Sequence, residues 1–207
     1  MARDRSSIVK MSRREGYALH PKAHKALVKR TSKPGQGPQS RGPRGGRASQ
    51  YSLQLREKQK VKRLYGLLER QFSNLMKEAS RRQGQSGQIL LQFLEQRADN
   101  VIYRAGFAPS RRAARQLVTH GHFTLNGVRV DIPSIRLKAG DVLTARAHSH
   151  KTEYFKKFDE TSPAPSETPG WLKVDRKKVT VSVTGSPSRD DAEPDINEQL
   201  IVEYYSR

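Results

Sequence analysis

Apolar side chains recur at helical spacing in two stretches of the chain. Between Val61 and Ala79 they occupy every third or fourth position, and cationic residues fall largely on the other sides of the same segment. This period is typical of an amphipathic helix. Glycines at 84 and 87 interrupt the pattern, and a second run of the same period extends from Ile89 to Ala105. The pattern predicts two or three helices that share one small core.

A second core is predicted farther along the chain. A short helix after Ser110 is ended by Gly121, and the next apolar segment turns at Asn126-Gly127, the strongest short-range hairpin signal. Alternating valines between 179 and 183 predict a further strand, and apolar positions between 196 and 202 suggest a short final helix. This region therefore predicts helices packed on a small antiparallel sheet.

The remaining segments are polar and rich in turn residues. Residues 1–30 carry many cations and few apolar anchors, and residues 31–50 hold five Gly and three Pro, which exclude regular structure. The stretch 31–50 is either a flexible linker or, because Arg41, Arg44 and Arg47 recur at steps of three, an arm that lies along RNA. Residues 159–170 form another polar, Pro-rich linker.

Charge narrows the class of partner. The 207 residues hold 40 Lys and Arg against 20 Asp and Glu, a net charge of +20 with a pI near 10.6. Such a surplus favours nucleic acid first and an acidic membrane second over a merely solvated basic surface. Residues 1–100 carry 23 basic and 7 acidic side chains, whereas residues 156–207 carry 8 and 10. The acidic end is therefore expected to meet a protein partner.

Several other classes are excluded by composition. The chain has no Cys, which excludes disulfides, thiol nucleophiles and cysteine-based zinc sites. The mean hydropathy is −0.83, and no apolar run approaches the roughly 20 residues that span a bilayer. The start is charged and lacks an apolar signal core, so secretion is not expected.

The helix after Ser110 carries the most informative chemistry. Arg111, Arg112 and Arg115 lie on one helix face by their spacing, where guanidinium groups can meet phosphates at a fixed geometry. The order of helix, basic helix, Gly and Asn-Gly hairpin resembles the small RNA-binding module of the ribosomal protein S four family. The same module occurs in several RNA-modifying enzymes, so alone it indicates RNA but no particular task.

Eight motifs extend this resemblance to nearly the whole chain. They occur in order, at the separations expected for the bacterial protein S four of the small ribosomal subunit, and a single one would be weak. They are Met1–Arg3, Met11–Gly16, Leu53–Lys60, Tyr65–Phe72, Asp99–Phe107, Ala114–Val118, Trp171–Asp175 and Asp195–Glu203.

The resemblance implies an α+β fold with three parts. These are a basic extended N-terminal arm with its linker (1–50), a small all-helical domain (51–93, completed by 195–207), and an inserted RNA-binding module with a Pro-rich linker and a C-terminal strand (94–194). The C-terminal segment is expected to pack back on the helical domain.

The resemblance also implies a function and partners. The expected role is a primary binder of 16S-type ribosomal RNA at a five-way junction of the 5′ domain, nucleating assembly of the small-subunit body. Further expected partners are ribosomal protein S five, across an interface tied to decoding fidelity, protein S three nearby, and messenger RNA where it enters the subunit. The expected place is a cytoplasmic, bacterial ribosome, with an organellar ribosome as the alternative. No membrane, small-molecule substrate or cofactor is expected.

One departure from the family concerns the N-terminal region. Some members carry a zinc knuckle there, and this chain has no Cys to form one. No metal is therefore expected, and the arm should be held by RNA contacts alone. Arg44 and Arg47 are the residues that by motif position would meet messenger RNA.

Candidate RNA contacts follow from residue type and motif position. Cations supply phosphate contacts, while amide, aromatic and imidazole side chains add sugar, base-edge or stacking contacts. Packing is an equal alternative for Tyr65, and for the histidines RNA or surface contact is favoured over zinc. The expected RNA-binding residues are Arg3, Lys10, Arg13, Arg14, Lys22, Arg44, Arg47, Tyr51, Gln54, Arg56, Lys58, Gln59, Lys60, Lys62, Arg63, Tyr65, Arg70, Gln71, Arg104, Arg111, Arg112, Arg115, Gln116, His120 and His122. The expected protein interface comprises Ile196, Asn197, Leu200 and Glu203.

Two other functions compete with this interpretation. An enzyme would need a pocket-bearing domain and a nucleophile or acid–base pair, and Asp99, the one suggestive carboxylate, is better placed to cap or orient a helix. The chain is therefore not expected to be an enzyme. A free-standing RNA chaperone would explain the module and the charge, but not the first 90 residues or the motif Asp195–Glu203.

Overall fold

The computed structural model describes residues 4, 6–30, 32–35, 49–165 and 167–206. Within it the chain forms two compact units, the first from residues 1–90 with 195–207 and the second from residues 91–194. We call them the helical unit and the sheet unit. Of the expected RNA contacts, Arg3, Arg44 and Arg47 lie outside the described residues.

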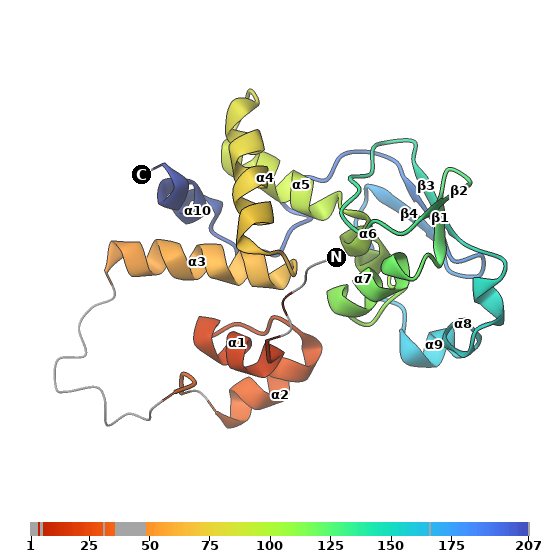
Figure 1. Ribbon diagram of the computed structural model, residues 1–207, viewed down its shortest axis with the longest axis horizontal. Coiled ribbons are helices and arrows are strands. Elements are labelled where there is room, and N and C mark those ends of the chain that lie inside the picture. The colour runs from red at the N-terminus through yellow and green to blue at the C-terminus, as the bar shows by residue number, and fades with distance from the viewer. Residues whose placement is uncertain (1–3, 5, 31, 36–48, 166, 207) are drawn as a thin grey trace. The chain divides into compact units, whose positions relative to one another are not determined.

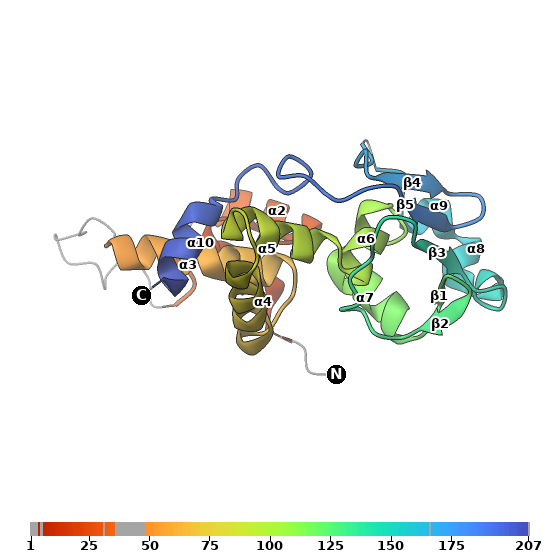
Figure 2. The same ribbon diagram turned by 90° about the horizontal axis from the view of Figure 1, so that it is seen from above.

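The helical unit is centred on two amphipathic helices and the C-terminal helix. Helix α3 (Gln50–Leu64), α4 (Glu69–Arg81) and the start of α5 (Ser86–Glu95) follow the predicted period. Helix α10 (Glu198–Tyr205) returns from the end of the chain to lie beside α3 (Figures 1 and 2). Val61, Phe72 and Ile201 are fully buried, so the last helix is part of this core.

The N-terminal region is helical where an extended arm was expected. Helix α1 (Ile8–Glu15) and α2 (Pro21–Lys29) pack on each other, and α1 contacts α3. Met11, Leu19 and Ala23 are buried, so three apolar anchors suffice once α3 offers a surface to cover. The start of α2 has the chemistry of a good helix N-terminus, with Pro21 at the first turn and a His20 side chain that accepts from the Lys22 backbone.

The sheet unit contains five antiparallel strands. These are β1 (Phe123–Leu125), β2 (Val128–Val130), β3 (Val142–Ala145), β4 (Leu172–Asp175) and β5 (Thr180–Val183), in the order β2-β1-β3-β5-β4. Figure 2 shows this succession across the sheet. The predicted valine strand therefore lies inside the sheet, between β3 and β4.

Helices complete the sheet unit. Helix α6 (Ala98–Arg104) and α7 (Arg111–Thr119) pack side by side (Figure 1), and a 3-10 turn η2 (Ser149–Lys151) leads to the short helices α8 (Glu153–Lys156) and α9 (Phe158–Thr161). The expected linker 159–170 therefore begins as helix. Side chains from α6, α7, α8, α9 and all five strands share one buried cluster.

The predicted hairpin is present with the expected turn. Asn126 has φ 50° and Gly127 φ 86°, the left-handed values that a two-residue turn of this type requires at both central positions. Phe123 pairs with both Val130 and Ala145, which places its ring in the core of the unit. The mixed α+β fold expected from the sequence is confirmed. In the described part of the chain, no helix has the length and apolar character needed to cross a membrane.

Candidate nucleic-acid interface

Helix α7 is positioned by its cap and by its arginines. The Ser110 side chain accepts a hydrogen bond from the Ala113 backbone N–H, which satisfies a donor at the helix N-terminus. Ala114, Leu117 and Val118 face the core, and Arg112 is exposed. Of the three expected arginines, Arg112 is therefore the exposed one, whereas Arg111 and Arg115 are half-buried.

Arg111 is engaged inside the sheet unit. Its Nε donates to Asn100 Oδ1 at 2.8 Å, and its Nη2 meets Glu193 Oε1 at 3.0 Å. The guanidinium also lies over the Tyr103 ring, 4.6 Å from the centroid. These contacts fix the half-buried Arg111 side chain between α6, α7 and the segment before α10.

Arg115 belongs to a second ion-pair cluster, centred on buried Asp99. Arg97 binds Asp99 through two parallel hydrogen bonds of 3.0 and 2.8 Å, and Arg115 adds a third at 3.0 Å. The Asp99 side chain is only 6% exposed. A buried carboxylate with two guanidinium partners is satisfied and orients α6 against α7, which is the structural role the sequence favoured for Asp99.

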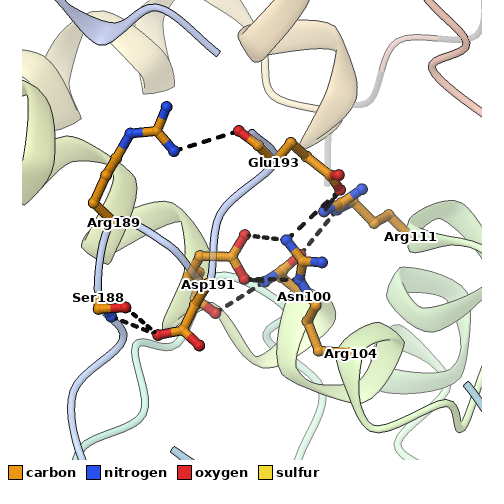
Figure 3. Close-up of polar contacts among 8 residues, drawn as sticks. Asn100, Arg104, Arg111, Ser188, Arg189, Asp191 and Glu193 are labelled. Carbon is orange, nitrogen blue, oxygen red and sulfur yellow. Dashed lines mark hydrogen bonds and ion pairs between the residues drawn. The ribbon is translucent and has the colours of Figure 1, made fainter. Parts of the chain in front are cut away.

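A third cluster surrounds Arg104 and includes Glu95 and Glu193. Figure 3 labels Arg104 and Glu193 in it. Arg104 binds the fully buried Glu95 carboxylate with two hydrogen bonds of 3.0 and 2.9 Å, and its Nη2 lies 3.6 Å from Glu193. The backbone carbonyl of Glu193 accepts from Arg189, and Asp191 accepts from Ser188. This network holds the segment 188–193 against α6 and α7.

His122 is half-buried beside the start of the hairpin. Its Nδ1 lies 3.1 Å from Ser149 Oγ, and its ring lies 6.0 Å from the ring of His120, which is exposed. Burial, together with the nearby His120 and Arg146, lowers the pKa of His122 below its ordinary value. His122 is therefore a neutral hydrogen-bonding and stacking group at pH 7, and the described residues include no cluster suited to holding a metal ion.

The cations of α3 are held by carboxylates in the helical unit. Arg56 and Arg63 share Glu15, whose side chain is fully buried. Burial raises the pKa of Glu15, opposed chiefly by those two arginines. Glu15 is thus a shared anchor that fixes two guanidinium groups.

A similar arrangement surrounds Glu69. Lys58 and Lys62 approach its carboxylate at 2.7 and 2.9 Å, and the Tyr205 hydroxyl donates at 3.0 Å. Burial opposes ionisation of Glu69, but the hydrogen bonds from Lys58, Lys62 and Tyr205 outweigh it and lower its pKa to about 2. Burial and the adjacent Glu69 charge in turn raise the pKa of Tyr205.

Three expected RNA contacts are buried in the helical unit. Gln54 donates to Glu203 at 2.8 Å. The Lys58 side chain is 4% exposed, and its ammonium lies 4.5 Å from the centre of the Tyr204 ring. Tyr65 is 3% exposed, which supports the packing alternative. These side chains are not available to RNA in this conformation. For Gln54 and Lys58 the reason is that α10 covers their face of α3.

Expected RNA contacts remain at the surface in both units. Tyr51 is 48% exposed. The half-buried ones are Arg13, Arg56, Gln59, Lys60, Lys62, Arg63, Gln71, Arg104, Arg111, Arg115 and His122, and the exposed ones are Lys10, Arg14, Lys22, Tyr51, Arg70, Arg112, Gln116 and His120.

Arg13 also corrects an expectation about the arm. Its guanidinium donates two hydrogen bonds to the Ser32 carbonyl, at 3.1 and 2.9 Å. Residue 32 is therefore held to α1 by the protein itself. The expectation that RNA contacts alone hold the N-terminal region is wrong for this part of it.

The expected protein interface is largely occupied within the helical unit. Ile196 is 4% exposed, the Asn197 side chain caps α10, and Glu203 accepts from Gln54 and Gln50 of α3. Leu200 is half-buried. The segment thus serves mainly to complete the core and to cap α10. Of the four expected interface residues, Leu200 is the one with a partly exposed apolar side chain.

Comparisons with known proteins match this arrangement along the chain. The S4 domain model matches residues 96–143, and the model for the ribosomal protein S4/S9 N-terminal domain matches residues 3–95. The chain is 48% identical to small ribosomal subunit protein uS4 of Chlorobium limicola and of Chloroherpeton thalassium, and 46% identical to that of Clostridioides difficile. In each case the match covers 100% of both chains. The chain belongs to the uS4 family.

Membership in the uS4 family decides between the functional classes considered from the sequence. It confirms the expected resemblance, and it confirms that the chain is not an enzyme, because this is a family of structural ribosomal proteins. The S4 domain match covers α6, α7 and the hairpin, the elements that carry the arginine clusters.

Sequence reasoning missed several residues that shape this uS4-family surface. Arg97 holds Asp99, Arg136 lies over the Phe93 ring at 4.5 Å, and Arg146 donates to the Gly121 carbonyl at 3.2 Å. A Cβ at Gly121 would meet the Arg129 guanidinium at 2.6 Å, so glycine permits that close approach. The only local signal was the proximity of Arg97 to Asp99; the others depend on tertiary contacts.

Proposed function

We propose that the chain is a constituent of the small ribosomal subunit that binds 16S-type ribosomal RNA. The observation that carries this proposal is the 48% identity, over the whole of both chains, to proteins named for the small subunit. The proposed site is a five-way junction of the 5′ domain, where the protein binds early and nucleates assembly of the body.

The geometry supports a structural RNA binder that reads shape. Each unit holds guanidinium or ammonium groups at fixed positions through buried carboxylates, Glu15 in one and Asp99 and Glu95 in the other. Contacts to phosphate carry affinity without reading sequence. Cations held at fixed positions within each unit therefore suit a folded junction better than a regular duplex.

Finer parts of the proposal concern partners. The C-terminal region around Leu200 is proposed to face ribosomal protein S five, with S three nearby, and to contribute to decoding fidelity. Arg44 and Arg47 are proposed to meet messenger RNA where it enters the subunit. The proposed location is a ribosome in the cytoplasm of a bacterium, which is in keeping with the bacterial sources of the relatives.

Binding to isolated RNA tests the central proposal. The purified full-length chain is titrated with a small-subunit 5′-domain junction RNA and with a scrambled duplex of equal length, across a salt series. We expect nanomolar binding to the junction that stays selective at physiological salt, with a log–log salt slope of roughly 0.7–0.9 per phosphate contacted.

Equal binding to the two RNAs that disappears with salt would contradict the proposal. It would mean that the net charge alone attracts RNA, as expected of the free-standing chaperone. The substitution Leu200→Ser provides a matched control for the partner assignment. It should leave junction affinity near normal while weakening association with purified protein S five.

A further inference from the structure

A cavity of about 300 Å³ opens in the sheet unit beside α8, α9 and the turn between β4 and β5. This volume lies at the lower end of the range for ligand pockets. Phe155, Phe158 and Val179 line it with apolar surface, and all three are buried in the core of the unit. The cavity thus offers a small apolar area on a rigid support.

The remaining lining of the cavity is charged and predominantly basic. Lys156, Lys157, Lys177 and Arg176 face two carboxylates, Asp159 and Glu160. The three lysines are exposed, and their ammonium groups make no ion pair within the described part of the chain. A ligand with negative charge is therefore favoured.

Arg176 lines the cavity, and its guanidinium is held in place by the protein. Its guanidinium donates to the carbonyls of Gly106 and Ser162 at 3.1 and 2.8 Å, and it pairs with Asp159 at 3.1 Å. It also lies 4.6 Å from the centre of the Phe158 ring. Because Arg176 neutralises Asp159, the three lysines dominate the charge that a ligand meets.

The backbone at the edge of the cavity is strained. Val179 has φ 49°, a left-handed conformation that is a genuine outlier for a β-branched residue. The Val179 N–H bonds the Arg176 carbonyl, and its own carbonyl accepts from Ala145. Such strain persists only where many surrounding contacts fix the backbone, and it is found most often at ligand sites. Here it fixes the turn that brings Lys177 and Val179 to one cavity.

Phe155 joins the cavity to the expected RNA surface. The centre of its ring lies 5.8 Å from that of His122 and 5.9 Å from that of His150, which also lines the cavity. His122 and its neighbour His120 are expected RNA contacts. The Phe155 side chain would therefore be all that separates the cavity from a strand of RNA that contacts these histidines.

We propose that this cavity holds one unstacked nucleotide of the bound RNA. Its phosphate meets Lys156, Lys157 and Lys177, and one edge of its base meets the small apolar area of Phe155, Phe158 and Val179. Proteins bind unpaired nucleotides by combining aromatic contacts with cations that follow the backbone. The inference rests on the proposed function, since it assumes that the chain binds RNA.

Two triple variants of the full-length chain test the proposal. One carries Lys156→Gln, Lys157→Gln and Lys177→Gln. The matched control carries Lys77→Gln, Lys138→Gln and Lys173→Gln, three exposed lysines outside the cavity and outside the expected RNA contacts. Both lose the same charge, and thermal unfolding should show equal midpoints because all six side chains are at the surface. Junction-RNA affinity and its salt slope are then measured for each.

We expect the cavity variant to lose about tenfold or more in affinity and its salt slope to fall by roughly 0.7–0.9 per phosphate contact removed. The control variant should change affinity less than about threefold, since screened charges act weakly at a distance. Ultraviolet cross-linking of the wild-type complex, followed by peptide mass spectrometry, should place a nucleotide adduct on residues 153–158. The adduct should be lost in the cavity variant.

Equal losses in the two variants, or adducts confined to other peptides, would overturn the inference. Excess inorganic phosphate separates a whole nucleotide from a simple anion. If phosphate removes the cross-link at constant ionic strength, the cavity binds only the anion and the proposed seat for the base is wrong. If the wild-type chain fails to distinguish junction RNA from scrambled duplex, the proposed function fails, and this inference fails with it.

Discussion

At the scale of single residues, several described cations of this uS4-family protein are held by carboxylates, and others have exposed side chains. Arg56 and Arg63 share Glu15, Arg97 and Arg115 share Asp99, and Arg112 is exposed. A held guanidinium loses less conformational freedom on meeting a phosphate. We therefore expect the carboxylates inside this basic protein to preorganise its cations for contact with RNA.

Glu69 should make the stability of the helical unit depend on acid pH. Its pKa is about 2 in the folded state against an ordinary 4.5, so its contribution is present above pH 4.5 and is lost as pH falls toward 2. Because the side chain is 47% exposed, solvent screening reduces that contribution to about 1 kcal/mol. Glu69→Gln should destabilise the protein by about this amount at pH 7 in denaturant unfolding.

The difference between wild type and Glu69→Gln should vanish near pH 2. Glu78→Gln is the control, because Glu78 forms an exposed pair with Arg82 that contributes at most about 0.5 kcal/mol. A pH-independent difference for Glu69→Gln would show that lost packing, and not ionisation, is the cause.

At the scale of elements, α7 combines a structural and an exposed cationic face. Arg111 and Arg115 are tied to α6 and to the segment before α10, while Arg112 is exposed on the same helix. Spacing alone placed all three arginines together at the phosphate surface. The structure indicates different roles for neighbours, and single substitutions can separate these roles.

Arg112→Ala should mainly lower RNA affinity, and Arg115→Ala should mainly lower stability. Arg112→Ala should change stability by less than about 0.5 kcal/mol and lower junction affinity roughly tenfold, the value of one charged hydrogen bond of about 1.5 kcal/mol. Arg115→Ala should lower stability by about 1–3 kcal/mol, because buried Asp99 loses a partner. Thermal unfolding and RNA titration measure both, with Lys77→Ala as a surface control. Unchanged RNA affinity for Arg112→Ala would remove this residue from the interface.

The local elements could be predicted, and their long-range partners could not. Asn126-Gly127 and Ser110 specify a turn and a cap through their own chemistry, so the hairpin and α7 follow from a few neighbouring residues. Glu193 meets Arg111 across 82 positions of sequence, and nothing local announces that pair. Lys58 looked exposed because its cover, α10, lies at the far end of the chain.

At the scale of the whole molecule, each unit is completed by a segment that lies near the end of the chain and is synthesised late. The segment from Asp195 through α10 completes the helical unit. Gln54 donates to Glu203, Lys60 donates to the Asp195 carbonyl, and the Glu57 carboxylate accepts from the Asn197 backbone. Strand β5 lies between β3 and β4. Neither core is complete in the N-terminal part of the chain.

Removal of residues 198–207 should therefore destabilise the helical unit while leaving the sheet unit folded. The truncation exposes the core around Phe72 and leaves Glu69 without the Tyr205 hydroxyl. Hydrogen exchange should show loss of protection in α3 and α4, and retained protection in β1, β3 and β5. Equal loss in both units would mean that they unfold as one body.

The position of β5 in the sheet has a consequence for the order of synthesis. Domains generally fold during translation as their residues emerge, but here β3 has no second neighbour until residues 180–183 have left the ribosome, and α3 has no cover until residues 198–205 follow. A nascent chain that stops before this point carries most of the protein's positive charge and lacks both finished cores. Synthesis of residues 180–205 thus completes both cores. We therefore expect an interrupted product to bind RNA less selectively than the full chain.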